Sequence, residues 1–258
     1  MLRLSKRKQT MMSDAIIQLQ ALQFAWKPNQ PVLHIDELTI NKRHKMFIKG
    51  PSGCGKTTLL ALLGGILKPQ QGQITLLGQD LTQLTDSQRD HFRSEHIGFI
   101  FQMFNLLPYL SVLDNITLPC RFSQKRQQRI KDKQSTPQAE AKQLVATLGL
   151  PENVLSKPVT ELSIGQQQRV AAARALIGGP EIIIADEPTS ALDYDARKSF
   201  LSLLFEVCDA HQATLLFVSH DPTLETLFDN TLSLMDINKA ASHHLSGQDN
   251  IHLLKEVG

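Results

Sequence analysis

Short apolar runs alternate along the chain with stretches of helical periodicity. Five runs have the length and composition of buried strands: 46–50, 96–102, 181–188, 213–221 and 231–237. Three stretches repeat apolar positions at helical spacing: 56–66, 164–177 and 195–209. Strands that alternate with helices predict an α/β fold with a mostly parallel central sheet.

Two regions differ from this pattern. The segments "IIQLQALQFAW" (16–26) and "VLHIDELTI" (32–40) alternate apolar with polar residues, which predicts an antiparallel sheet with one face in water. Residues 104–165 carry helix patterns without buried strands, and we interpret them as a helical subdomain inserted into an α/β core of residues 14–103 and 166–258. The basic residues 1–13 precede the first periodic segment, so we expect a loose extension there.

Composition indicates a folded protein with no nucleic-acid signature. Hydrophobic residues make up 41% and charged residues 20% of the chain, and its formal net charge is +2. The charged run at 125–133 lacks interleaved aromatic residues, so it predicts a solvated helix face rather than a binding patch. We therefore expect no nucleic-acid partner.

The cysteines and the longest apolar run limit the location of the protein. Cys54, Cys120 and Cys208 lie far apart without metal-ligand or disulfide spacing, which fits a reducing cytoplasm. The longest apolar run, 59–67, is far shorter than the ~20 residues of a membrane span. No apolar segment typical of a secretory signal follows the basic N-terminus. We expect a cytoplasmic protein that does not cross a bilayer by itself.

The segment "LSIGQQQRV" (162–170) opens a predicted helix and has two interpretations. Ser163 followed three residues later by Gln166 fits a capping box, the ordinary start of a helix. Alternatively, the N–H groups at this helix start, with Gly165 beside them, bind an anion such as a phosphate. The segment alone leaves both interpretations open.

The stretch "GPSGCGKTT" satisfies the phosphate-loop pattern G-x-x-x-x-G-K-[ST] between a predicted strand and a predicted helix. Glycines let backbone N–H groups surround phosphates, Lys56 reaches the β and γ oxygens, and the Thr57 hydroxyl is a Mg²⁺ ligand. We expect the whole loop to bind a nucleoside triphosphate through Gly50, Pro51, Ser52, Gly53, Cys54, Gly55, Lys56, Thr57 and Thr58.

Polar residues follow three of the predicted strands. "IIIADE" ends in Asp186 and Glu187. In a nucleotide site, Asp186 would be a Mg²⁺ ligand and Glu187 would be placed to activate a water. The alternative is that both are solvated acids before a turn. Gln102 follows "HIGFIF" and His220 follows "LLFVS". Each could simply begin a loop, but at one sheet edge Gln102 could orient Mg²⁺ and water, and His220 could contact the γ-phosphate.

The order "GPSGCGKTT", "FQ", "LSIGQQQRV", "IIIADEP", "SALD", "SH" resembles the nucleotide-binding subunit of ATP-binding cassette (ABC) transporters over nearly the whole chain. The resemblance implies a P-loop NTPase fold with a RecA-like core, an antiparallel β subdomain and a helical subdomain. It implies that residues 50–58 are Walker A, Gln102 the Q-loop residue and His220 the switch histidine, and that Asp186 and Glu187 end Walker B. The signature motif would be Ser163, Gly165 and Gln166, with Asp193 in the D-loop and Trp26 stacking on adenine, unless that tryptophan is simply a core or surface residue.

The segment "FNLLPYLSVLDNITLP" (104–119) is similar to the branch that contains lipoprotein-releasing and macrolide-efflux ATPases. In that branch the segment adjoins the groove that receives a coupling helix of the permease. The chain departs from the family in two places. Ile164 stands where the signature usually has glycine, and "RHK" (43–45) replaces a Gly-Glu turn.

The resemblance implies an ATPase that uses ATP and Mg²⁺, dimerises around two nucleotides and drives a separate permease at the cytoplasmic face of the inner or plasma membrane. Glu187 would be the general base, while Lys56, Gln102 and His220 would assist it. The alternative is a regulatory ABC ATPase of the cell-division or assembly type. A P-loop kinase or nucleic-acid motor does not explain "LSIGQQQR" together with His220, and the one Walker A motif excludes a double-cassette translation factor.

Overall fold

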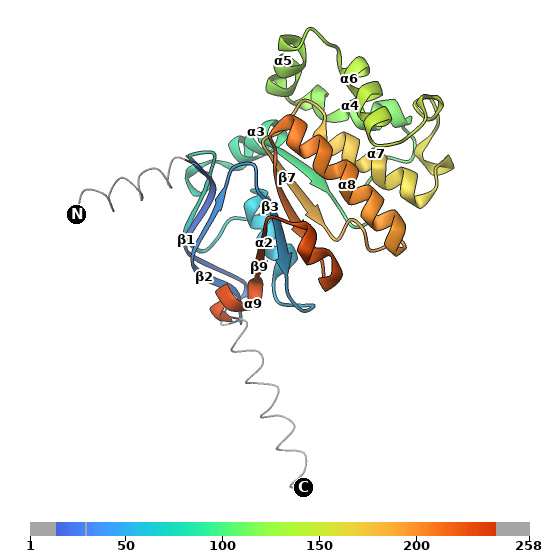
Figure 1. Ribbon diagram of the computed structural model, residues 1–258. Helices are drawn as coiled ribbons and strands as arrows, with labels where there is room; N and C mark the ends of the chain where they lie inside the picture. Colours follow the sequence, from blue (N-terminus) through green and yellow to red (C-terminus); the bar gives the residue numbers. More distant parts are fainter. Residues whose placement is uncertain (1–13, 29, 241–258) are drawn as a thin grey trace, which may run out of the picture. The chain divides into compact units, whose positions relative to one another are not determined.

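The computed structural model describes residues 14–28 and 30–240, so the predicted extension of residues 1–13 lies outside the described residues. The chain divides into two compact units, whose helices and strands are labelled in Figure 1. The first unit contains the described residues of 1–42 and 231–258 together with 48–85. The second contains 43–47 and 86–230. Each unit is described by itself below.

The first unit contains the antiparallel sheet that the alternating segments predict. Its strand order is β2-β1-β4-β5, with β1 at Ala15–Lys27, β2 at Gln30–Asn41, β4 at Gln71–Leu76 and β5 at Gln79–Asp80. β1 pairs antiparallel with β2 and β4. Ile17 and Leu19 are fully buried whereas Gln20 is exposed, because alternate side chains of a strand point to opposite faces.

Two elements of the first unit differ from the prediction. Helix α2 (Lys56–Leu63) ends three residues early, because Gly65 takes a φ of +66° and Ile66 N–H donates back to the carbonyl of Ala61. The strand predicted at 231–237 was wrong in its second half: β9 (Asn230–Ser233) gives way to a one-turn helix, α9 (Leu234–Ile237). A short apolar run does not distinguish a strand from a helix by periodicity. A 3-10 turn, η1 (Leu81–Gln83), follows β5.

The five-stranded sheet confirms the α/β prediction. Its order is β6-β7-β8-β3-β9, with β3 at Lys45–Lys49, β6 at Ile97–Ile100, β7 at Ile182–Asp186 and β8 at Thr214–Val218. β7 pairs parallel with both β6 and β8. β7 and β8 are almost wholly buried, as expected for parallel strands that are covered on both faces.

The helices of the second unit are α3 (Asp86–His96), α4 (Val112–Phe122), α5 (Gln124–Asp132), α6 (Pro137–Thr147), α7 (Ile164–Leu176) and α8 (Tyr194–His211). Short 3-10 turns lie at Glu152–Val154, Val159–Glu161 and Pro222–Leu227. Residues 104–165, all described, contain helices and one isolated β-bridge, Ser111 to Pro158. The buried alanines of α7 pack in one apolar cluster with α4, α6 and the sheet.

The turn before β3 accommodates arginine in place of the glycine expected in the family. Arg43 adopts a φ of +64°, a left-handed conformation that costs a non-glycine residue about 1 kcal/mol. Its backbone N–H donates to Thr214 Oγ1 at 2.8 Å. This hydrogen bond holds the turn at the start of β8.

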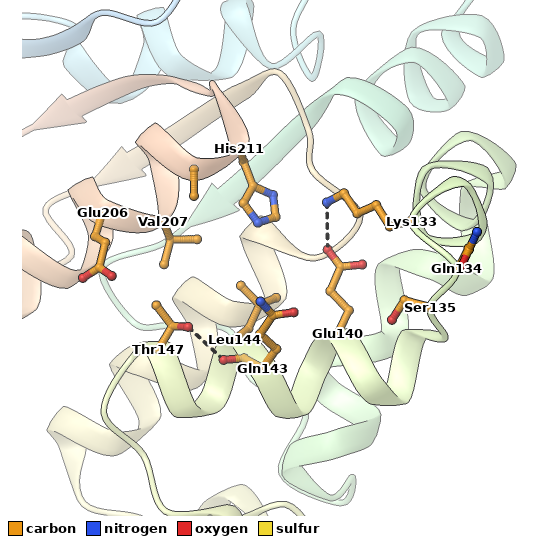
Figure 2. Close-up of a pocket in the computed structure, with 11 residues that line it drawn as sticks. Lys133, Gln134, Ser135, Glu140, Gln143, Leu144, Thr147, Glu206, Val207 and His211 are labelled. Carbon is orange, nitrogen blue, oxygen red and sulfur yellow. Dashed lines mark hydrogen bonds and ion pairs between the residues drawn. The ribbon is translucent and has the colours of Figure 1, made fainter.

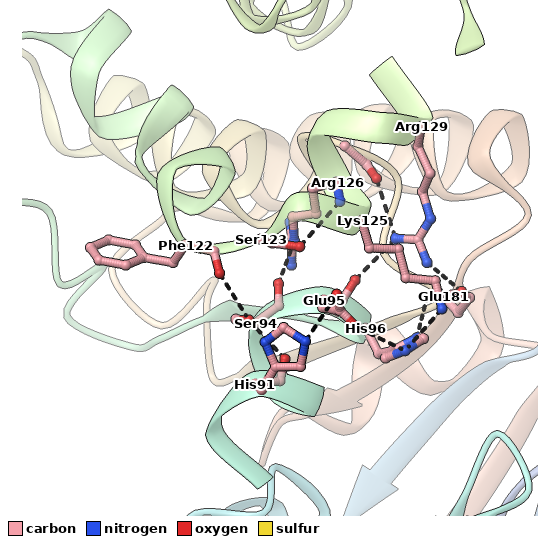
Figure 3. A network of polar contacts seen from close by, with 11 residues as sticks. His91, Ser94, Glu95, His96, Phe122, Ser123, Lys125, Arg126, Arg129 and Glu181 are labelled. Carbon is pink, nitrogen blue, oxygen red and sulfur yellow. Dashed lines mark hydrogen bonds and ion pairs between the residues drawn. The ribbon is translucent and has the colours of Figure 1, made fainter. Parts of the chain in front are cut away.

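The charged run at 125–133 is exposed at Lys125, Gln128, Lys131, Asp132 and Lys133, as predicted for a solvated face, but Arg126 within it is buried. Arg126 of α5 is only 2% exposed, and its guanidinium donates to the carbonyl of Ser94 at 2.8 Å (Figure 3). It also donates to the carbonyls of Ile97 and Ile177, each at 2.7 Å. A further bond to the carbonyl of Ala175 is 3.3 Å long. Burial lowers the pKa of Arg126 to about 10, so the group stays charged at neutral pH. Arg126 thus joins the ends of α3 and α7 to the start of β6.

Two neighbours extend this arrangement at the surface of the unit. Arg129 forms an ion pair with Glu181, the residue before β7, and Glu181 also contacts His96 Nδ1 at 3.0 Å (Figure 3). Glu181 is partly buried, but hydrogen bonding and charge from His96, together with Arg129, hold the pKa of its carboxyl below the usual value. One face of α5 is therefore solvated as predicted, while Arg126 and Arg129 on the other face donate to backbone carbonyls, which the sequence did not predict.

Replacing Arg126 with Met should lower the free energy of unfolding by at least about 3 kcal/mol, because several buried carbonyls lose their donor and each such loss costs about 1–3 kcal/mol. Urea unfolding of the full chain measures this loss. Arg121→Met is the control, since Arg121 has a 63% exposed side chain and an exposed pair of this kind contributes about 1 kcal/mol or less. Equal losses in the two variants would contradict the assigned role of Arg126.

Candidate active site

The phosphate-loop residues 50–58 connect β3 to α2 in the first unit, as predicted. Gly53 and Gly55 have φ angles of +80° and +101°, which favour glycine. A Cβ at Gly55 would lie 2.8 Å from Leu33 Cδ2, whereas at Gly53 no described atom would lie within 4 Å of it. Gly55 is therefore fixed by packing, and Gly53 faces open space.

The start of α2 has the properties of an anion site. Gly55 is its N-cap, no side chain of the described residues caps it, and its first turn carries no acidic residue. Uncapped N–H groups and the helix dipole together favour an anion. Lys56 Nζ donates to the carbonyls of Gly50 at 2.7 Å and Pro51 at 3.0 Å, so the ammonium lies over the loop. This cradle fits the phosphates of a nucleotide, and the Thr57 hydroxyl at the same helix start is an oxygen donor of the type that Mg²⁺ prefers.

Asn238, which the sequence analysis did not single out, supports this loop. It is 1% exposed, and its amide donates to the carbonyls of Cys54 at 3.1 Å and Val32 at 2.9 Å. Its carbonyl oxygen accepts from the N–H groups of His34 and Ala240. All four hydrogen-bonding positions of the amide are used. The turn of α9 places this residue, which explains why the chain leaves the strand conformation at Leu234.

Trp26 lies at the end of β1 in the first unit, with 63% of its surface exposed. Its ring packs edge-on against Phe24 at 5.0 Å and lines a hollow of about 310 Å³ with Pro28, Pro31 and Gln71 among others. The Gln70 side chain pairs with both backbone groups of Ala25 and so fixes the adjacent chain. Trp26 is therefore not a core residue, and its exposed ring face can stack on a planar base.

The second unit brings Glu187 and His220 together. Asp186 is the last residue of β7, Glu187 follows it, and Glu187 Oε2 lies 3.1 Å from His220 Nδ1. Glu187 has a φ of +45°, and its N–H donates to the carbonyl of Val218, the last residue of β8. Non-glycine residues in this conformation cluster at functional sites. The alternative of two freely solvated acids does not fit a carboxylate that is 19% exposed and paired with an imidazole.

Gln102 is exposed in the turn after β6, two residues beyond the end of the strand, and His220 lies equally far beyond β8. In each case the strand ends at its last residue paired with β7, which is Ile100 in β6 and Val218 in β8. Next to Gln102, Phe104 and Asn105 both have positive φ. Arg174 of α7 donates to the carbonyls of these two residues at 2.6 Å. This arginine, which the sequence analysis did not single out, therefore ties the segment after Gln102 to the helix of the predicted signature.

Helix α7 begins with the predicted capping box. Ser163 Oγ accepts from the N–H of Gln166, and Gln166 Oε1 accepts from the N–H of Ser163. Ile164 is the first helical residue and is 55% exposed, while Gly165 and Gln166 are half-buried. A right-handed helical backbone suits isoleucine, so the residue that replaces glycine causes no strain here. The local helix interpretation is confirmed, and the anion-binding one stays a prediction.

Asp193 is the N-cap of α8, where its carboxylate accepts from the N–H of Ala196 at 2.8 Å. Four residues on, Arg197 donates to the carbonyl of Leu192 and forms an ion pair with Asp221. The hydrogen bond from the Thr223 hydroxyl, and to a smaller extent that from Arg197, keeps the pKa of Asp221 below its usual value. Arg197 thereby connects the segment before Asp193 to the residue after His220.

The predicted Mg²⁺ ligands offer oxygen donors from separate places. Thr57 belongs to the first unit, and Gln102 and Asp186 belong to the second. In the described residues no group of three or more His, Cys, Asp or Glu side chains could hold a metal ion. Hydroxyl, amide and carboxylate oxygens are the ligands of a hard cation that also binds substrate phosphates.

Within residues 14–28 and 30–240, no helix is both long and apolar enough to span a membrane.

Comparison with known proteins identifies relatives along most of the chain. The family profile described as ABC transporter matches residues 33–190. The lipoprotein-releasing system ATP-binding protein LolD of Psychrobacter arcticus is 39% identical over 200 residues, which cover 77% of this chain and 84% of LolD. The macrolide export ATP-binding/permease protein MacB 2 of Aeromonas hydrophila is 37% identical over 87% of this chain and 34% of its own length.

Solved structures agree. A dimeric ATP-binding cassette in a post-hydrolysis state with ADP and Pi is 30% identical, has a TM-score of 0.72, and covers 84% of this chain and 93% of its own. CbiO1 from Clostridium perfringens, part of an ABC transporter complex, has a TM-score of 0.75 at 23% identity and covers 95% of this chain and 96% of its own, which shows the fold alone. The resemblance seen in the sequence, including its branch, is confirmed.

Changing Asn238 to Asp should weaken ATP binding, because two donors to the carbonyls of Val32 and Cys54 are lost beside the phosphate loop. We expect the free energy of unfolding to fall by about 2–4 kcal/mol, the cost of two unsatisfied buried carbonyls. Thermal unfolding without nucleotide and ATP titration measure the two effects. Asp236→Asn, an exposed change in the short helix that precedes Asn238, serves as the control. If it matched Asn238→Asp in both assays, the supporting role of Asn238 would be wrong.

Proposed function

The chain belongs to the ABC transporter family and is an ATPase, and we propose that it is a nucleotide-binding subunit that dimerises around two ATP and drives a separate membrane permease. The observation that carries the proposal is the contact between Glu187 and His220 at the ends of β7 and β8, in a chain that also has an uncapped phosphate loop. The relatives LolD and MacB 2, by name a lipoprotein-releasing and a macrolide export protein, support the transport class.

Nucleotide binding is assigned mainly to the first unit. The N–H groups of residues 50–58 surround the phosphates, with Lys56 moving from the carbonyls of Gly50 and Pro51 to the β and γ oxygens. Trp26 stacks its exposed face on the adenine ring. Thr57, Gln102 and Asp186 would be the residues that hold Mg²⁺, and the ion would supply positive charge to the phosphates.

Hydrolysis is assigned to the residues that follow β7 and β8. Glu187 accepts the proton of the attacking water as general base. His220 holds the Glu187 carboxylate in position through Nδ1 and contacts the γ-phosphate through the rest of its ring. Lys56 stabilises charge on the transferring phosphoryl group, and Gln102 orients the water.

Dimerisation supplies the second half of each site. We assign Ser163, Gly165 and Gln166, at the start of α7, to the ATP held by the other subunit. Asp193 lies at the same interface, where its cap of α8 sets the preceding segment. The dimeric cassette with ADP and Pi at 30% identity supports this arrangement. Opening and closing of the dimer would then follow the nucleotide state.

Permease docking is assigned to the segment after Gln102 and to a hollow beside it. Phe99, Phe101, Pro119 and Phe122 line a hollow of about 270 Å³ in the second unit, and Phe122 is 69% exposed. Met103 and Tyr109, at 81% and 78% exposure, add apolar surface. Exposed apolar surface of this kind marks an interaction site. A coupling helix of the permease would bind there, next to the helical subdomain of residues 104–165 in the ATPase domain of residues 14–258. This contact would hold the ATPase on the cytoplasmic face of the membrane.

Replacing Glu187 with Gln should lower ATP turnover by about 10²–10⁴-fold, because the general base is lost while ATP binding is kept. A dimer that persists with ATP should accumulate, which size-exclusion chromatography with ATP and Mg²⁺ detects. Glu152→Gln, at an exposed acid of the second unit, is the control and should keep the parent rate. Parent-level hydrolysis by the Glu187 variant would rule out the base assignment.

Affinity purification of the full chain from membranes of its native host should recover a permease with few membrane spans and a large external domain. Substituting Phe122 with Glu should reduce that recovery while ATP binding stays intact, because a charge would be buried in the docking contact. Mass spectrometry of the purified complexes measures both. Recovery of a soluble complex alone would instead favour the regulatory ABC ATPase.

A further inference from the structure

A second pocket lies in the second unit, away from the residues assigned to nucleotide chemistry. It has a volume of about 570 Å³, within the range of small-molecule sites (Figure 2). Its walls come from the loop after α5, one face of α6 and the last turns of α8: Lys133, Ser135, Glu140, Leu144, Glu206 and His211 are among them. The proposed function uses none of these side chains.

Glu140 is the unusual member of this pocket. The residue is 5% exposed, and neither carboxylate oxygen has a hydrogen-bond partner among the described residues. Its closest cation is Lys133, whose Nζ lies 3.8 Å from Oε1, too far for a hydrogen bond. Buried carboxylates are normally satisfied by donors, since an unmade bond to a charged group is expensive. Glu140 therefore has unused capacity to accept hydrogen bonds from a ligand.

The surroundings favour a cationic donor. The Lys133 side chain is 54% exposed, so it can turn outward when another ammonium enters. Burial, followed by the charge of Lys133, lowers the pKa of His211 to about 4, so the imidazole is neutral at pH 7 and does not repel a cation. Its Nδ1 is buried and has no hydrogen-bond partner among the described residues.

The opposite wall supplies a second carboxylate. Glu206 of α8 lines the pocket on the far side from Glu140, with Val207 and Leu144 between them (Figure 2). Two acids separated by an aliphatic surface are complementary to a ligand with two ammonium groups on a hydrocarbon chain. A metal ion fits less well, because the described residues offer no group of three or more His, Cys, Asp or Glu ligands.

We propose that this pocket binds an aliphatic diamine. One ammonium donates to the buried Glu140 carboxylate beside neutral His211, the methylene chain lies on Leu144 and Val207, and the second ammonium pairs with Glu206. Because α6 and α8 contribute opposite walls, a bound diamine joins the two helices and stabilises the second unit.

Isothermal titration calorimetry of the full chain without ATP, at pH 7.5, tests the site with 1,4-diaminobutane and 1,6-diaminohexane as probes. We expect saturable 1:1 binding that raises the thermal unfolding midpoint, and weaker binding of butylamine, which has one ammonium. Glu140→Gln should weaken diamine binding by about tenfold or more, because it removes charge-assisted hydrogen bonds. Glu206→Gln should lower the affinity for the diamines to that for butylamine.

Glu152→Gln is the matched control, since Glu152 is an exposed acid outside the pocket, and it should bind like the parent. Glu140→Gln is isosteric and removes a buried charge, so the unfolding midpoint without ligand should not fall. The proposal is overturned if neither diamine binds saturably to the parent chain. It is equally overturned if the Glu140 and Glu152 variants bind with the same affinity.

Discussion

The parallel register of β6, β7 and β8 is the constraint on which the second unit depends. Ile100 pairs with Ala185 and Asp186 with Val218, so the three strands end at one edge of the sheet. The ladder continues one step further, because Glu187 N–H donates to the carbonyl of Val218. That hydrogen bond holds Glu187 in a left-handed conformation and brings its carboxylate to His220. The contact between Glu187 and His220 thus follows from the point at which backbone pairing stops.

Arginines that donate to backbone carbonyls connect this edge to the helices. Arg126 joins α3, β6 and the end of α7, Arg174 holds the chain after Gln102, and Arg197 links the segments around Asp193 and His220. A planar guanidinium with five donors can satisfy several carbonyls from one position. Helix α7 is therefore joined by direct hydrogen bonds to the segment after Gln102.

Several features could be predicted from residues alone. The phosphate loop, the capping box at Ser163 and the antiparallel pairing of β1 with β2 depend on local patterns, and the structure contains all three. Asn238, Arg126 and Arg174 could not be found this way, because the carbonyls to which they donate lie between 29 and 206 residues away in sequence. The strand expected at 231–237 failed for the same reason: the turn of α9 is decided by the partners that Asn238 reaches.

By itself, the sequence determined the family, the phosphate loop and the two acids at the end of β7, because each depends on short motifs defined by residue type and spacing. The tertiary structure decided which charged side chains face water and which are buried. Arg126 and Glu140 occur in ordinary polar stretches, yet one is satisfied by four carbonyls and the other by no hydrogen bond from the described residues. Burial is set by neighbours distant in sequence, so the free energy and the role of a charge are properties of the fold.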